Sequence, residues 1–374
     1  METADPRAVC PAHVADDFLR TLIRTAATET HCSYCGTTGK SPFAITRIAF
    51  VEAILVGVGV HYEPQTVPGE AVAARGVAVE VLTAAGVSHP DLVDDVVDAL
   101  SVTPGWVRRD HRSGNSIEQL TYSWEAFKHI VKYEMRYFFS TRPTGDADEM
   151  TAGQVLAAVS DLGEHHPAVW PAPCPAPLFR ARMATSQDEA ASWHHVADIG
   201  PPPSERAAAN RMSPAGISIF YGATDRATAI AEAGAHAAFR YVTTAEFTPT
   251  PELRLIDLTN LPAPPSIFDA AAHPEFYILR FLQMFIHDIT LPVELDGHEH
   301  IDYVPTQVFT EYFRHAFPGR VDGLMFPSAQ GPGNNVVVFV GPGQCADLGA
   351  DTEHTRLTMD PNTLRVSRVM TVAR

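Results

Sequence analysis

Hydrophobic residues in the first half of the chain recur at helical spacing. Within residues 116–139, large apolar side chains follow one another every three or four positions: Leu120, Trp124, Phe127, Val131, Met135 and Phe138. This spacing predicts one amphipathic helix. Residues 89–100 show the same pattern on a smaller scale, with Pro90 where a helix start tolerates proline. Residues 41–165 are therefore predicted to form a small helical bundle.

The pattern changes in the second half of the chain. Short runs rich in β-branched and aromatic residues predict strands at residues 178–182, 217–221, 240–247, 253–258, 323–326 and 335–340. Helical patterns between these runs predict helices at residues 225–233, 274–288 and 305–316. Strands mixed irregularly with helices indicate a domain of the α+β class.

A proline-rich stretch separates the two patterns. Residues 166–177 (HPAVWPAPCPAP) contain five prolines, which neither a helix interior nor a central strand accommodates. We interpret this stretch as a linker between domains. A chain of 374 residues also exceeds the size that one hydrophobic core usually organises.

The charge balance limits the classes of partner. Lys and Arg number 27 against 44 Asp and Glu, a formal net charge of −17, so nucleic-acid binding is disfavoured. A small anionic ligand remains compatible, because a few local arginines can hold it. We expect no membrane-spanning segment, since no apolar run reaches about 18 residues. The N-terminal residues METADPRAVC lack the features of a secretory signal, so we expect a cytoplasmic protein.

Three of the five cysteines lie near the N-terminus. The motifs CPAH (10–13) and CSYC (32–35) predict that Cys10, His13, Cys32 and Cys35 bind a structural zinc ion, because x2 spacing lets one tight turn present two ligands. Gly36 follows the second pair and supplies the positive φ that such a turn uses. His31 is the alternative histidine ligand, and a chance cluster or a redox CxxC is the alternative interpretation of the motif. For Cys174 and Cys345 we expect free thiols.

Four polar residues of the second half stand where a hydrophobic core would not place them. They are Arg180 in LFRAR (178–182), Arg211 in NRMSPAG (210–216), Glu232 at the end of TDRATAIAE (224–232) and Ser328 in FPSAQGPGNN (326–335). Each alone is compatible with an ordinary surface or turn residue.

Together, five segments in order resemble the RES domain family over residues 178–345. The segments are LFRAR, RMSPAGISIFYG, ATAIAE, DYVPTQVFTEYFR and VDGLMFPSAQGPGNNVVVF. The resemblance implies that the family's glutamate is Glu232, its serine Ser328, and its arginine either Arg180 or Arg211. It also places Tyr221 beside the ligand. The chain departs from the family at Met212, where Trp or Phe is more common.

The resemblance implies a fold similar to ADP-ribosyltransferases and NAD as substrate. The expected reaction breaks the nicotinamide–ribose bond, with Arg211, Glu232 and Ser328 as catalytic residues and Arg180, Arg211 and Tyr221 binding NAD. Water, inorganic phosphate or a protein side chain would each be an acceptor found in the family. The implied role is a toxin or defence effector with an antitoxin or immunity partner, and an oligomer is left open.

The first half resembles the HEPN-like helical region fused to RES domains, over roughly residues 5–145. HEPN ribonucleases use an R-x4–6-H motif, and the match here runs from Arg24 to His31, inside the predicted zinc loop. Ribonuclease activity and a non-catalytic interaction module are therefore the weaker alternatives. The predicted organisation is a zinc knuckle (1–40), a HEPN-like domain (41–165), a linker (166–177) and a RES domain (178–374).

Overall fold

The computed structural model describes residues 6–66, 71–109, 124–137, 153–154, 156, 171–235, 240–291, 297–317 and 319–369. These form two compact units. Unit 1 comprises Met1–Glu118 and Ala263–Tyr277, and unit 2 comprises Gln119–Pro262 and Ile278–Arg374. Unit 1 is mainly helical and unit 2 contains a large mixed sheet with helices, so the predicted α+β class is confirmed.

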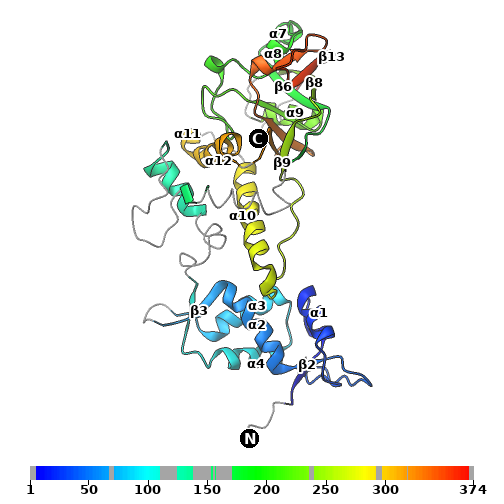
Figure 1. Ribbon diagram of the computed structural model, residues 1–374, viewed down its shortest axis with the longest axis vertical. Helices are drawn as coiled ribbons and strands as arrows, with labels where there is room; N and C mark the ends of the chain where they lie inside the picture. The colour runs from blue at the N-terminus through cyan, green and yellow to red at the C-terminus, as the bar shows by residue number, and fades with distance from the viewer. Residues whose placement is uncertain are drawn as a thin grey trace. The chain divides into compact units, whose positions relative to one another are not determined.

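Unit 1 is built on four helices, which Figure 1 shows in blue and cyan: α1 (Asp17–Thr25), α2 (Arg47–His61), α3 (Ala74–Ala85) and α4 (Pro90–Leu100). The predicted helix at 89–100 corresponds to α4, with Pro90 in its first turn. In α2, Gly57 allows Phe268 to approach, since a Cβ there would lie 2.5 Å from that ring. Residues of unit 1 that follow position 262 in the chain therefore complete the core around α2.

Short elements complete unit 1. The pair β1 (Ala8–Val9) and β2 (Ile45–Thr46) is antiparallel, as is the pair β3 (Tyr62–Pro64) and β4 (Trp106–Arg108). A 3-10 turn, η1 (Pro11–His13), follows β1. The β1–β2 pair joins the chain before the predicted zinc motif to the start of α2.

Unit 2 contains a nine-stranded sheet with the order β12-β13-β8-β6-β7-β11-β10-β9-β5. Its strands are β5 (Ala172–Pro173), β6 (Leu178–Ala184), β7 (Phe220–Ala223), β8 (Tyr241–Pro249), β9 (Arg254–Asp257), β10 (Gly323–Pro327), β11 (Asn334–Val338), β12 (Cys345–Asp347) and β13 (Leu357–Arg368). Most neighbours are antiparallel, and the pairs β9–β10 and β12–β13 are parallel.

Several helices of unit 2 lie between these strands in the sequence. They are α7 (Gln187–Ala191), α8 (Val196–Ile199), α9 (Arg226–Gly234), α10 (His273–Thr290), α11 (Glu299–Asp302) and α12 (Val304–His315). The three helices predicted for this half correspond to α9, α10 and α12. Residues His273–Tyr277 of α10 belong to unit 1 and the rest to unit 2.

One predicted strand of this half begins later in the structure, and the strands β5, β12 and β13 were not predicted. Within the run predicted at 217–221, the strand begins only at Phe220. Two serine side chains hold the preceding residues in other hydrogen bonds. Ser213 Oγ donates to the Ile217 carbonyl, and Ser218 Oγ donates to the Pro202 carbonyl at 2.6 Å. The sequence patterns did not predict β13, whose register shifts between Asp360 and Arg365 and so interrupts the alternation that marks a strand.

The predicted linker and the long predicted helix are described only in part. Of the linker, residues 171–177 are described, and β5 within them pairs with β9 at the edge of the sheet. An edge strand accommodates proline because one side of its backbone needs no ladder partner. Of the helix predicted at 116–139, residues 124–134 are helical, the last five as a π-helix (η3, Ile130–Glu134). Leu120 and Phe138 lie outside the described residues.

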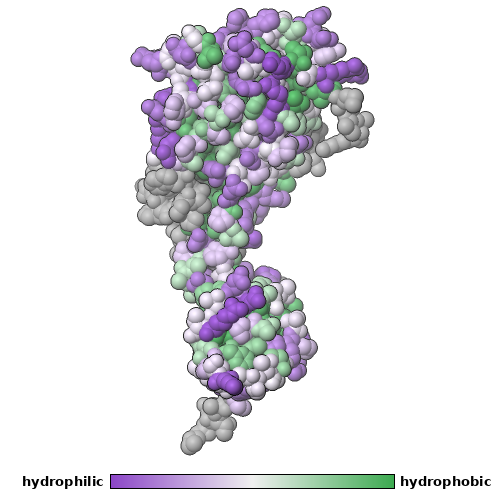
Figure 2. Space-filling view, turned by 90° about the vertical axis from the view of Figure 1, so that its right-hand side faces the viewer, coloured by the Kyte–Doolittle hydropathy of each residue, from purple (hydrophilic) through white to green (hydrophobic). Residues whose placement is uncertain are grey.

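Figure 2 shows how hydrophilic and hydrophobic residues are distributed over one face of the molecule. On the face drawn in Figure 2, hydrophilic residues cover much of unit 2 and hydrophobic residues form only small groups. Among the described residues, no helix has both the length and the apolar composition needed to cross a membrane.

Candidate functional site

The predicted metal ligands lie together in unit 1. One ligand atom each from Cys10, His13, Cys32 and Cys35 lies within 4.8 Å of the others. The Sγ atoms of Cys10 and Cys35 are 3.8 Å apart, about the separation of two thiolates bound to one tetrahedral zinc ion. Gly36 has φ of 68°, as expected for the turn, and its N–H donates to the Cys32 carbonyl at 3.0 Å.

An unpartnered nitrogen supports metal binding at this cluster. Nε2 of His13 is buried and makes no hydrogen bond within the described residues. A buried polar atom without a partner is costly, and a metal ion would satisfy it. His31, the alternative ligand, points its Nε2 at the Pro6 carbonyl, 3.1 Å away. The residues present therefore fit a closed four-ligand zinc site, which leaves no open position for a substrate.

A buried carboxylate attaches the cluster to α4. Asp95 is 7% exposed and accepts a hydrogen bond of 2.6 Å from the hydroxyl of Tyr34, which lies between the two cysteines of CSYC. Arg7 also donates to Asp95, and Arg47 lies 4.0 Å from it. Burial, together with Asp95, raises the pKa of Tyr34. The knuckle is thus part of the folded core of unit 1.

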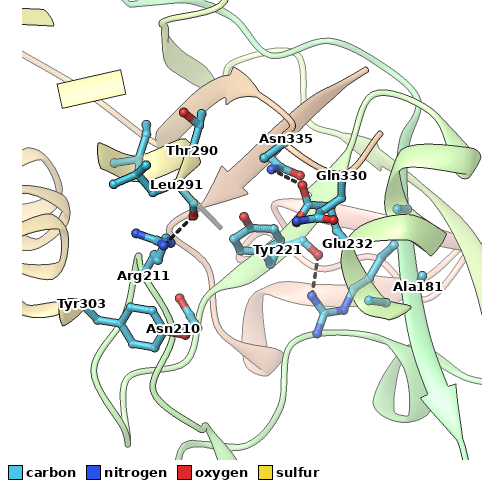
Figure 3. A pocket seen from close by; sticks show the side chains of 16 residues that line it. Ala181, Asn210, Arg211, Tyr221, Glu232, Thr290, Leu291, Tyr303, Gln330 and Asn335 are labelled. Atoms are coloured by element: carbon cyan, nitrogen blue, oxygen red, sulfur yellow. Dashed lines mark hydrogen bonds between the residues drawn. The ribbon is translucent and has the colours of Figure 1, made fainter. Parts of the chain in front are cut away.

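The predicted RES residues surround one cavity of about 300 Å³ in unit 2. Arg180, Arg211, Tyr221 and Glu232 line it, together with residues the sequence analysis did not single out: Asn210, Gln330, Thr290, Leu291, Tyr303 and Asn335. In the view of Figure 3, Tyr221 lies between Arg211 and Tyr303 on one side and Glu232 with Asn335 on the other. Ser328 does not line the cavity, but it contacts a residue that does.

The carboxylate of Glu232 is held through one oxygen. Oε1 accepts hydrogen bonds from Ser328 Oγ at 2.5 Å and from Asn335 Nδ2 at 2.8 Å. Within the described residues, no hydrogen bond ends on Oε2, which leaves this oxygen for a ligand. Oγ of Ser328 in turn accepts the N–H groups of Gln330 and Gly331 at 3.1 and 2.9 Å. Glu232 therefore has a fixed orientation with one oxygen available.

The glycines of the Ser328 loop allow it to pack against the start of α9. A Cβ on Gly333 would lie 1.9 Å from Oδ2 of Asp225, and one on Gly331 would lie 2.6 Å from Oγ1 of Thr228. The N–H of Gly333 donates to Oγ1 of Thr228 at 2.9 Å. Asp225 caps α9 by accepting the N–H of Thr228 at 2.8 Å. Gly331 and Gly333 are therefore required because the loop packs closely against this capped helix start.

Arg211 is held on the other side of the cavity by the ends of two helices. Its Nη1 donates to the carbonyl of Asp288 at 2.8 Å and its Nη2 to that of Leu291 at 2.5 Å, both at the C-terminal end of α10. The guanidinium lies 5.7 Å from the centre of the Tyr303 ring, just before α12. The carbonyl of Arg211 accepts the hydroxyl of Thr306 at 2.6 Å. Burial lowers the pKa of Arg211.

Arg180 reaches the cavity from β6. Its Nε donates to the Ile199 carbonyl at 2.8 Å and its Nη1 to the Tyr221 carbonyl at 2.6 Å, while the guanidinium lies 5.5 Å from the centre of the Phe220 ring. No described carboxylate forms an ion pair with it. Burial lowers the pKa of Arg180 to about 10, so the side chain is positively charged at neutral pH.

Tyr221 presents a neutral hydroxyl. Burial, and then the negative charge of Glu232, raise the pKa of Tyr221 above its ordinary value. Its hydroxyl is therefore protonated at neutral pH and able to donate. Met212, the departure from the family pattern, is 1% exposed and does not line the cavity. It lies in the core, where Oγ1 of Thr310 is 3.4 Å from its sulfur.

The contribution of Asn335 and Tyr303 was not deduced from the sequence. Asn335 is the second residue of β11 and is 3% exposed; the signal in the sequence was a pair of asparagines directly before the apolar run VVVFV. Tyr303 belongs to the segment DYVPTQVFTEYFR, but nothing in the spacing placed its ring beside Arg211. Within the described residues, the buried Oδ1 of Asn335 has no hydrogen-bond partner. It can therefore accept a hydrogen bond from a further donor.

Comparison with protein families identifies two matching regions in the chain. The RES domain family matches residues 177–360, and HEPN/RES N-terminal domain 1 matches residues 25–144. The chain is therefore a RES domain protein with a HEPN-like N-terminal region. No curated protein and no solved structure matches the chain.

The HEPN match does not bring the predicted R-x6-H residues into a catalytic arrangement. Arg24 lies in the last turn of α1, while His31 lies in the zinc loop against the Pro6 carbonyl. The structure therefore offers no support for a ribonuclease centre at these two residues.

Proposed function

We propose that this protein cleaves the bond between nicotinamide and ribose in NAD. One observation carries the proposal: a carboxylate with a free oxygen, Glu232, lines the same cavity as two half-buried arginines, Arg180 and Arg211. Membership of the RES domain family, which is linked to NAD-related toxin–antitoxin systems, supports this assignment.

The chemistry of the bond explains the need for a carboxylate. When the bond breaks, its electron pair leaves with the nicotinamide nitrogen, and positive charge develops on the ribose as an oxocarbenium ion. Oε2 of Glu232 would bind the ribose hydroxyls and stabilise that charge electrostatically. Ser328 and Asn335 would keep the carboxylate oriented, so little reorganisation is needed in the transition state.

The arginines would bind the pyrophosphate of NAD. Both use part of their guanidinium on main-chain carbonyls, which fixes the position of each positive charge. Planar guanidinium donors suit phosphate oxygens. The hydroxyl of Tyr221 would contact the ribose or nicotinamide. A cavity of about 300 Å³ is at the small end of ligand pockets and fits the nicotinamide nucleoside part of the substrate.

The acceptor determines the reaction type. Water yields ADP-ribose, inorganic phosphate yields phosphorylated ADP-ribose, and a protein side chain yields an ADP-ribosylated protein. We propose water or phosphate as the acceptor, and a protein side chain is the alternative. Loss of cellular NAD arrests growth, so the proposed role is that of a toxin or defence effector with an antitoxin partner. The zinc ion at Cys10, His13, Cys32 and Cys35 would be structural.

The test measures products. Purified protein is incubated with NAD, with and without phosphate, and the products are identified by mass. Free nicotinamide is expected, and Glu232→Ala should abolish its release while the protein stays folded. The matched control is Glu205→Ala, an exposed glutamate outside the cavity, which should behave as wild type. Undiminished nicotinamide release from Glu232→Ala would overturn the proposal. No turnover of NAD together with a copurifying protein would favour an interaction module instead.

A further inference from the structure

Residues 124–134 pack on helices α10 and α12 of unit 2. The rings of Trp124 and Phe127 stack with their centres 5.4 Å apart, and each lies edge-on to Phe309 of α12 at 5.1 Å. Trp124 also lies edge-on to Phe285 of α10 at 5.9 Å. The segment is thus anchored on α10 and α12, the two helices whose ends hold Arg211.

Two lysines of this segment, one helical turn apart, form ion pairs at the border of the cavity. Nζ of Lys128 lies 2.9 Å from Oδ2 of Asp288, which also accepts Nε1 of Trp124 at 2.7 Å. Nζ of Lys132 lies 2.7 Å from Oδ1 of Asp302. Both lysine side chains are only 21% exposed, so salt screens these pairs less than it screens fully exposed ones.

Both aspartates belong to segments that contact Arg211. The carbonyl of Asp288 accepts Nη1 of Arg211, while its carboxylate binds Lys128. Asp302 immediately precedes Tyr303, whose ring lies against the Arg211 guanidinium. Lys128 therefore binds the residue whose carbonyl accepts from Arg211, and Lys132 binds the residue that precedes Tyr303.

We propose that Lys128 and Lys132 are positioning residues that hold Arg211 and Tyr303 in place for the substrate. Residues 124–134 fall within the match to HEPN/RES N-terminal domain 1. The region matched by that family thus supplies part of the support for the cavity of the RES domain. The kinetic consequence rests on the proposed NAD-cleaving function.

The kinetic test separates binding from chemistry. Glu232 is oriented by contacts that do not involve the lysines, so the double variant Lys128→Met/Lys132→Met should raise KM for NAD about tenfold and change kcat less than about twofold. Lys128→Arg/Lys132→Arg keeps both charges and should restore KM. Arg320→Met is the matched control, because it removes ion pairs to Glu252 and Asp322 elsewhere in unit 2 and should leave KM unchanged.

Hydrogen exchange tests the positioning without NAD. Peptides covering 284–291 and 299–306 should exchange faster in the Met double variant than in wild type or the Arg variant. Asp302→Asn, at a side chain 55% exposed, provides a milder variant and should accelerate exchange in 299–306. If the wild-type protein fails to cleave NAD, the proposed function is wrong. Hydrogen exchange then still tests whether the two lysines hold Arg211 and Tyr303 in place. Unchanged exchange, a loss of kcat with constant KM, or an equal effect from Arg320→Met would overturn it.

Discussion

The hydroxyl of Ser328 donates a hydrogen bond of 2.5 Å to Oε1 of Glu232, although the two residues are 96 positions apart in the chain. The serine thereby joins the Gly-rich loop before β11 to the last turns of α9. It orients the carboxylate and at the same time accepts two main-chain N–H groups of its own loop. Its role in the proposed reaction is therefore indirect, through Glu232.

Replacement of this serine tests that indirect role. In Ser328→Ala, Glu232 loses a charge-assisted hydrogen bond of about 1.5–3 kcal/mol, so kcat should fall about 10- to 100-fold. The activity loss should be smaller than in Glu232→Ala. Ser204→Ala, at an exposed position, is the control in steady-state assays of nicotinamide release. A Ser328→Ala enzyme as active as wild type would show that the hydrogen bond has no part in catalysis.

Asn335→Asp should change the pH dependence. The new carboxylate would share the site of Glu232, and two like charges in contact raise the pKa of one of them. Because this pKa is raised, one of the two carboxylates becomes protonated at a higher pH than Glu232 alone would. The acid limb of the pH–rate profile should therefore move to higher pH. Asn362→Asp, at an exposed site, should leave the profile in place; an identical profile for both variants would contradict the shared-site geometry.

Gly333→Ala should lower stability. Its Cβ would meet Oδ2 of Asp225 at 1.9 Å, so either the loop or the cap of α9 must move, at a cost of about 1–3 kcal/mol. Gly343→Ala is the matched control, since nothing lies within 4 Å of a Cβ there. Denaturant unfolding monitored on both variants provides the comparison. Equal midpoints would mean that the loop does not pack on α9 in solution.

Arg180→Lys should weaken substrate binding. The guanidinium of Arg180 binds the carbonyls of Ile199 and Tyr221 at once and keeps Nη2 for a ligand. A lysine cannot reproduce this planar arrangement. We expect the Kd for NAD, measured by calorimetry in a Glu232→Ala background, to rise about tenfold. Arg182→Lys, next but one along β6 and outside the cavity, should bind NAD normally, and an equal loss there would point to a general charge effect.

Removal of the metal should loosen the structure of unit 1 before it lowers the rate of NAD turnover. We expect about one zinc ion per chain, and chelation or Cys35→Ser should increase hydrogen exchange in residues 6–61. NAD turnover should persist at first, because the cavity lies wholly in unit 2. Cys174→Ser, outside the cluster, should keep its metal. Prompt loss of turnover without loosening of residues 6–61 would contradict a purely structural ion.

Local patterns in the sequence determined several elements of this protein. Helical periodicity located α4, α10 and α12, because one apolar face along a helix is a property of neighbouring residues. The x2 spacing of CPAH and CSYC predicted the four side chains of the Cys/His cluster that could hold a metal, for the same reason. The resemblance to the RES family identified Glu232 and Ser328 by their motifs.

Only the tertiary structure decided how these parts combine. It brought Arg180 and Arg211 to one cavity and selected His13 over His31 as the histidine of the cluster. It also placed Asn335 on Glu232 and linked Lys128 and Lys132 to the support of Arg211. These contacts join residues far apart in the chain, so they depend on how helices and sheet pack. Spacing within any one segment carries no information about that packing.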